Sequence, residues 1–190
     1  MKSCGDESFS SVTIDTDLRD IVVAGSINYD TASKVLYGLR QLESLGKSNI
    51  NLLIASPGGE FGATVAMADA IELAKPKVIG QAFGECMSAA AFLLQACDTR
   101  YIAPSCRFMI HNAHIELGVN TFESLSKEGK ELKYVTDAYC QKMASRSNLT
   151  LDQVVKLCNN ETYMSAEIAV GYGFADAVLG SVKRKKNAKR

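Results

Sequence analysis

The sequence predicts an α/β fold with mostly parallel strands, on two observations. Short β-branched runs bounded by glycine or proline alternate with segments of helical periodicity from residue 20 to about residue 97. The links between these segments are short, which is typical of repeated βαβ units. With 190 residues, 47% hydrophobic and 22% charged, the chain is long enough for one domain with a sizeable core. We therefore expect one domain over residues 18–182, preceded by a flexible segment (1–17) and followed by a basic disordered tail (183–190).

The first half of this domain is expected to hold three strands that alternate with three helices. The first helix has Asp30 as a plausible N-cap and Gly46 where a left-handed C-cap is wanted. In order, the expected elements are a strand at 20–25, a helix at 30–46, a strand at 49–55, a helix at 63–73, a strand at 77–82 and a helix after Ser88.

Two loops follow strands in this half, at residues 56–59 and 84–88. The first, Ser-Pro-Gly-Gly, turns tightly and can expose backbone amides, while the second places Ser88 among small residues. Sites in parallel sheets gather at the carboxyl ends of strands, so the two loops are expected to be neighbours. Ser88 is either a nucleophile at a helix start or a residue packed in a small-residue contact.

The second half begins with two short strands, at residues 99–103 and 107–110, and His111 follows directly. A histidine at a strand end is either a structural residue or a general base, and His114, in a looser segment, is a weaker candidate. A helix is then expected over residues 120–146, with Asn120 and Glu123 suited to a capping box. At 1.5 Å per residue it would be roughly 40 Å long, and it either folds back on the core or projects to another subunit.

Three shorter elements complete the domain. Capping residues predict a helix that begins after Thr150 with Gln153 as partner, and another that begins at Ser165 and ends near residues 171–173. A last strand is expected at residues 175–179.

Composition excludes several function classes. Lys+Arg and Asp+Glu are both 21, so net charge favours neither nucleic acid nor a membrane surface. The six cysteines include no C-x-x-C pair and there are only two histidines, so no metal or other cofactor is expected. No apolar run has the roughly 18 residues of a membrane span and no signal peptide is recognised, which predicts a reducing cytoplasm. The chain lacks a G-x-x-x-x-G-K loop, so any ATP is expected to be bound by a partner.

Three groups could together perform acyl transfer. Ser88 supplies a hydroxyl, His111 a base, and the amides near Gly59 supply donors for an oxyanion. The serine is not in a G-x-S-x-G elbow, which disfavours the α/β-hydrolase arrangement.

Five motifs, in one order, carry a resemblance to a known family. They lie at residues 18–25, 54–59, 84–94, 109–112 and 164–176. In this order they resemble the Clp protease proteolytic subunit, caseinolytic peptidase P. The resemblance covers about residues 18–180.

The resemblance implies the ClpP/crotonase fold and a serine endopeptidase that cleaves unfolded polypeptides. By position, Ser88 would be the nucleophile and His111 the general base, and the amides of Gly59 and Ala89 would form the oxyanion hole. The long helix would match the handle that interlocks two stacked heptameric rings, a tetradecamer around a closed chamber. An AAA+ unfoldase is the partner that such a chamber would use.

The third triad residue departs from the family pattern. The family has an aspartate shortly before the segment that corresponds to residues 163–166, and an ungapped alignment places Leu157 there. A loop shorter by two residues places Asn159 there, with Asn160 or another residue as the alternative. The sequence around Asn159 is more similar to phage and prophage members of the family. A neutral amide can orient a histidine but cannot stabilise an imidazolium as aspartate does, which predicts a slow peptidase.

Three alternatives to an unfoldase-linked protease stay open. A phage-type member would cleave capsid or scaffold proteins without an unfoldase, and a ring subunit that has lost triad residues would be structural and catalytically weak. A crotonase acting on acyl-CoA shares the fold, but its chemistry does not need the pairing of Ser88 with His111.

Overall fold

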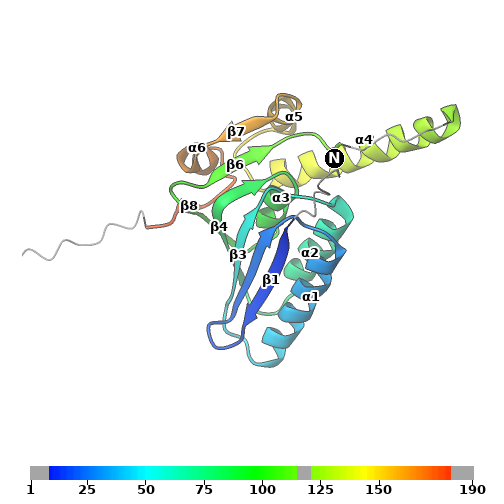
Figure 1. Ribbon diagram of the computed structural model, residues 1–190. Coiled ribbons are helices and arrows are strands. Elements are labelled where there is room, and N and C mark those ends of the chain that lie inside the picture. Colours follow the sequence, from blue (N-terminus) through cyan, green and yellow to red (C-terminus); the bar gives the residue numbers. More distant parts are fainter. Residues whose placement is uncertain (1–8, 115–120, 181–190) are drawn as a thin grey trace, which may run out of the picture.

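The computed structural model describes residues 9–114 and 121–180, and within them the strands form one mixed sheet (Figure 1). The sheet order is β1-β2-β3-β4-β5-β8, and β6 pairs with both β4 and β7. The strands are β1 Ser10–Asp15, β2 Asp20–Gly25, β3 Ile50–Ser56, β4 Val78–Met87, β5 Thr99–Ile102, β6 Arg107–Ile110, β7 Thr162–Met164 and β8 Ala177–Val178. The helices are α1 Tyr29–Ser44, α2 Phe61–Glu72, α3 Ala89–Gln95, α4 Phe122–Ser145, α5 Leu151–Asn159 and α6 Ala166–Gly171.

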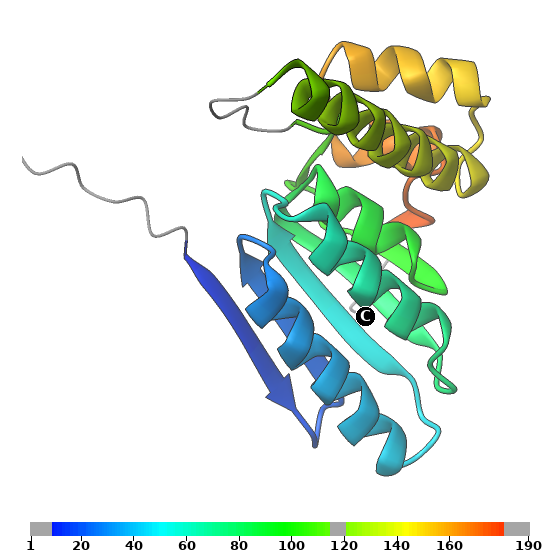
Figure 2. The same cartoon turned by 90° about the vertical axis from the view of Figure 1, so that its right-hand side faces the viewer.

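The α/β fold expected from the alternation is confirmed. Strands β2, β3, β4 and β5 pair in parallel, and α1, α2 and α3 lie side by side on one face of the sheet (Figure 2). Apolar side chains of the strands and of these helices form a continuous core in which every residue of α3 is buried. The helices cover a face of the sheet and not the carboxyl ends of its parallel strands. The loops that follow these strands are therefore available to form a site.

Strand β4 directs the chain toward that site. Its first part pairs with β5, and its last three residues, Glu85 to Met87, pair with β6. Its register with β3 also shifts, from Ile54 opposite Ala82 to Ser56 opposite Cys86. The irregularity carries the end of β4 past the end of β3, so the 56–59 turn lies beside Ser88.

Two strands were not among those expected. Residues 10–15, placed in the flexible segment from sequence, form β1, which pairs antiparallel with β2. Strand β7 pairs antiparallel with β6. Both are short and only partly buried, so neither has the continuous apolar run that marked the inner strands.

The capping predictions were correct at two helices and wrong at two. Thr150 with Gln153 caps α5, and Ser165 caps α6, as expected. Asn28, not Asp30, caps α1, because its side chain accepts a hydrogen bond from the third helical amide.

Helix α4 also begins one residue later than its expected cap, since Thr121 accepts a hydrogen bond from the amide of Ser124. Asn120 lies outside the described residues. The C-terminal part of α4 packs on the core through Tyr139, Cys140 and Met143, while its N-terminal part projects from the body (Figure 1). Its 24 residues span about 36 Å.

Candidate active site

Ser88 lies at the junction between β4 and α3, in a backbone conformation that few side chains adopt. Its φ is 52° and its ψ is −121°. The amide of Ser88 donates a hydrogen bond of 2.9 Å to the carbonyl of Met109 in β6, which holds this conformation. Strained backbone positions of this kind cluster at active sites.

The 56–59 turn is pressed against Ser88 from the side of β3. The buried hydroxyl of Ser56 accepts a hydrogen bond of 3.0 Å from the amide of Gly58. A methyl group on Gly58 would lie 2.8 Å from Cβ of Ser88, and one on Gly59 would lie 2.1 Å from the carbonyl oxygen of Ile27. Only glycine permits these two approaches, and the two loops expected to be neighbours are in contact.

His111 directly follows β6, and its side chain reaches Ser88. Its Nε2 lies 2.7 Å from Oγ of Ser88, which is hydrogen-bond distance. Burial lowers the pKa of His111 below its ordinary value, as does the neighbouring His114, and the carboxylate of Glu161 opposes them. A lowered pKa keeps the imidazole neutral, the form that can accept a proton from the serine.

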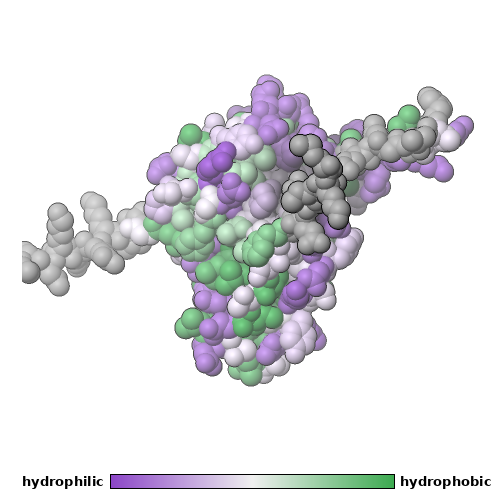
Figure 3. Space-filling model, in the orientation of Figure 1, coloured by the Kyte–Doolittle hydropathy of each residue, from purple (hydrophilic) through white to green (hydrophobic). Residues whose placement is uncertain are grey.

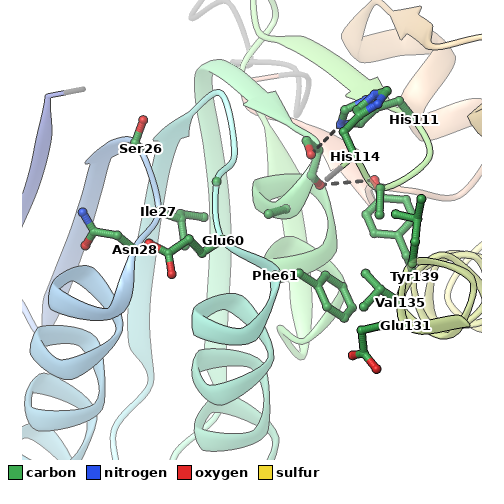
Figure 4. A pocket seen from close by; sticks show the side chains of 15 residues that line it. Ser26, Ile27, Asn28, Glu60, Phe61, His111, His114, Glu131, Val135 and Tyr139 are labelled. Atoms are coloured by element: carbon green, nitrogen blue, oxygen red, sulfur yellow. Dashed lines mark hydrogen bonds between the residues drawn. The ribbon is translucent and has the colours of Figure 1, made fainter. Parts of the chain in front are cut away.

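The hydrogen-bond partner of His111 differs from the residue expected in sequence. Nδ1 of His111 lies 2.8 Å from Nε2 of His114, whereas Oδ1 of Asn159 accepts a 2.7 Å hydrogen bond from Nδ2 of Asn112. Figure 4 shows the two imidazole rings next to each other at the upper edge of the site. His114 was the weaker of the two histidine candidates, and nothing in the H-x-x-H spacing identifies a hydrogen-bonded pair.

A cavity of about 670 Å³ opens beside Ser88 and His111. Its lining is apolar on the side of α2 and α4 and carries the carboxylates of Glu60 and Glu131 (Figure 4). The apolar lining residues include Phe61, Leu132, Val135 and Tyr139. A cavity of this size and chemistry accommodates one or more apolar side chains of a ligand.

Tyr139 links α4 to the site, a role that the helical periodicity alone did not reveal. Its hydroxyl donates a 3.2 Å hydrogen bond to the carbonyl of Ser88. Its ring stacks on Phe92 of α3, with centroids 5.9 Å apart. The long helix therefore fixes the segment that carries the serine as well as projecting from the body.

One cluster among the described residues has ligand atoms close enough to consider a metal ion. His111, His114 and Glu161 each place one such atom within 4.8 Å of the others. Two ligands of a tetrahedral zinc with bonds of about 2.0 Å lie about 3.3 Å apart. The 2.8 Å between the two ring nitrogens instead suits a hydrogen bond from one to the other.

Comparison with known proteins identifies a family. The family model described as Clp protease matches residues 5–182. Among solved structures, an asparagine-to-aspartate mutant of ClpP1 from Listeria monocytogenes superposes with a TM-score of 0.80 at 25% sequence identity. The match covers 86% of this chain and 92% of that one. Across residues 9–114 and 121–180, no helix is both long and apolar enough to cross a membrane.

Proposed function

Because the chain belongs to the Clp protease family, which consists of serine-type peptidases, we propose that Ser88 is its nucleophile and His111 its general base. The observation that carries this assignment is the 2.7 Å between Oγ of Ser88 and Nε2 of His111. The two residues follow different strands, β4 and β6, and a nucleophile within hydrogen-bond reach of a base is what acyl transfer requires.

In the proposed reaction, neutral His111 takes the proton of Ser88 as Oγ attacks the carbonyl carbon of a peptide bond. The negative charge on the carbonyl oxygen is stabilised by the amides of Gly59 and Ala89. Neither amide has a hydrogen-bond partner among the described residues. His111 then gives the proton to the leaving amine, and water, deprotonated by the same imidazole, releases the acyl group from Ser88.

The substrates proposed are unfolded polypeptides. An apolar cavity directly beside the nucleophile favours cleavage after an apolar side chain, the kind that folding hides. Restricting access to such a site requires a chamber. We propose the double heptameric ring, a tetradecamer, with the projecting half of α4 at the contact between rings.

Surface composition supports assembly. Large apolar side chains are exposed on the body and on α4, among them Tyr29, Tyr37, Leu73, Leu125 and Tyr134, and Figure 3 shows apolar residues gathered over the middle of the body. An AAA+ unfoldase is the proposed source of unfolded chains. The five cysteines within the described residues are free and buried, which suits a reducing cytoplasm.

A structural, catalytically weak ring subunit is the second candidate. It is favoured by one observation, that the residue hydrogen-bonded to His111 is a histidine and not a carboxylate. A phage-type protease that acts on capsid or scaffold proteins without an unfoldase would use the same site.

Labelling with a fluorophosphonate probe tests the assignment. We expect the assembled protein to be labelled on Ser88, with no labelling in Ser88→Ala and labelling slowed by roughly 10³-fold or more in His111→Ala. Native mass measurement of each variant controls for assembly. An assembled ring that is not labelled at Ser88 would show that the site is not a working peptidase.

A further inference from the structure

We propose that Glu131 of α4 determines specificity in the cavity beside Ser88, and extends the side chains accepted there from apolar ones to lysine and arginine. The apolar wall of the cavity holds the aliphatic stem of such a side chain, and the carboxylate of Glu131 binds its cationic end. The inference rests on the proposed function and narrows it, because it names the class of residue that precedes the cleaved bond.

The charged side chains that line the cavity have one sign. Among the acidic residues, lysines and arginines that the structure describes, only Glu60 and Glu131 line it. Glu60 directly precedes α2, and Glu131 lies near the middle of α4. A cleft that is lined by charges of one sign attracts ligand groups of the opposite sign. The cavity therefore favours a cationic group over an anionic one.

The carboxylate of Glu131 is available to such a group. The ion pairs formed within residues 9–114 and 121–180 use other carboxylates, and neither Glu60 nor Glu131 takes part in one. Both residues are exposed. A ligand cation can therefore approach Glu131 without first displacing a lysine or arginine of the described chain.

The wall of the cavity that α4 forms is apolar near the serine and charged further away. Glu131, Val135 and Tyr139 are four residues apart and so lie on one face of the helix, and Figure 4 shows them following one another along this wall. Tyr139 is the residue at the serine, because its hydroxyl lies 3.2 Å from the carbonyl oxygen of Ser88. Glu131 lies two turns further on, about 12 Å along the helix axis.

A long side chain with an apolar stem and a cationic end matches this order of surfaces. Lysine and arginine place their methylene stems on apolar surface and keep the charged end in water. Figure 4 shows Phe61 pointing from α2 toward Val135, so the stem has apolar groups on both sides. A short side chain cannot reach Glu131, and the carboxylate of a substrate glutamate would be repelled by it.

Glu60 has the same charge but a different place in the cavity. Its backbone amide donates a 2.9 Å hydrogen bond to the carbonyl of Ile27, and Figure 4 shows Glu60 beside Ile27, with Phe61 between it and Glu131. The apolar wall of α4 does not lead to Glu60. Glu60 therefore contributes to the negative potential of the cavity without binding the cationic end.

Peptide hydrolysis by the assembled protein tests the assignment. The probes are short fluorogenic peptides that differ only in the residue before the cleaved bond, which is lysine, glutamine or glutamate. In the wild type we expect kcat/KM for the lysine peptide to exceed that for the glutamine peptide by about 5-fold, the contribution of one exposed ion pair. Glu131→Gln should bring this ratio close to one, and Glu131→Lys should make the glutamate peptide a better substrate than the lysine peptide.

Glu60→Gln is the matched control, because it removes the same charge from the same cavity. It should reduce the lysine-to-glutamine ratio by less than about 2-fold. A second control is a peptide in which the lysine lies several residues from the cleaved bond, whose kcat/KM should not depend on residue 131. Native mass measurement of each variant confirms assembly.

The contrary outcomes separate this inference from the proposed function. A wild-type ratio close to one, or equal losses in Glu131→Gln and Glu60→Gln, would overturn the role of Glu131 while the peptides are still cleaved. Binding of the same peptides to assembled Ser88→Ala, measured by fluorescence anisotropy, should give the same order without catalysis. An assembled wild type that cleaves none of the peptides would overturn the proposed function, and the binding ratios in Ser88→Ala would still decide on Glu131.

Discussion

Replacing Gly58 by alanine should damage the catalytic serine directly, because the new methyl group would occupy the space of Ser88. It would lie 2.8 Å from Cβ of Ser88, 2.9 Å from the carbonyl oxygen of Met87 and 3.0 Å from the amide nitrogen of Ala89. Carbon atoms in contact normally lie about 3.5–4.0 Å apart, so the two segments must separate by roughly 1 Å.

The size of the effect has two parts. Gly58 has a φ of +106°, which a residue with a side chain adopts at a penalty of about 1–3 kcal/mol. Overpacking adds about 1–3 kcal/mol, so we expect a loss of stability of about 2–6 kcal/mol. A displacement of the nucleophile by about 1 Å is expected to lower kcat by on the order of 10²-fold.

Gly84→Ala is the matched control for Gly58→Ala. Gly84 also has a positive φ, +59°, but no atom lies within 4 Å of the added methyl group. It should lose only about 1–2 kcal/mol for the backbone conformation and keep its kcat. The assay is peptide hydrolysis normalised to the concentration of assembled protein, with thermal unfolding measured on each variant. Equal kcat in Gly58→Ala and the wild type, or equal losses in the two variants, would refute the steric argument.

Two further predictions concern residues that support the site. The guanidinium of Arg100, whose residue is 7% exposed, donates hydrogen bonds to the side chains of Asp176 and Gln95. Arg100→Met should therefore lower the free energy of unfolding by about 3 kcal/mol. Denaturant unfolding measures this, and an unchanged midpoint would contradict it. Tyr139→Phe removes the hydroxyl that donates a hydrogen bond to the carbonyl of Ser88 but keeps the ring. It should lower the free energy of unfolding by about 1 kcal/mol and reduce kcat, measured by peptide hydrolysis, by less than about 10-fold. A larger loss of activity would mean that the hydroxyl contacts the reacting atoms.

The sequence predicted the parts of the fold whose periodicity is set by burial. The inner strands are apolar runs in which fully buried residues alternate with half-buried ones, as in β3, and α1 has an apolar stripe because it packs on the sheet. Strands β1 and β7 were missed because neither has such a run. These two strands form because they pair with a neighbouring strand, β2 or β6. Such pairing does not require an apolar run that could be recognised in the sequence.

From sequence, Ser88 and His111 were named as a possible nucleophile and base, and the family resemblance then implied these roles by position. The register shows the physical reason that the two residues meet. Met87 lies opposite Met109 in the parallel pair of β4 and β6, so the residues just beyond both strands emerge at the same edge. In any parallel sheet, the residues that follow neighbouring strands lie close together. Which strand pairs with the end of β4, however, depends on tertiary structure. Here β4 leaves β5 and pairs with β6.

The side chain beside Nδ1 of His111 could not be located from sequence. Asn159, the residue expected there, accepts a hydrogen bond from the side chain of Asn112, whereas Nδ1 of His111 lies 2.8 Å from Nε2 of His114. His114 lies beyond the end of β6 in a segment without regular secondary structure. Periodicity predicts which face of a helix or strand is buried, but it does not predict where the side chains of such a segment lie.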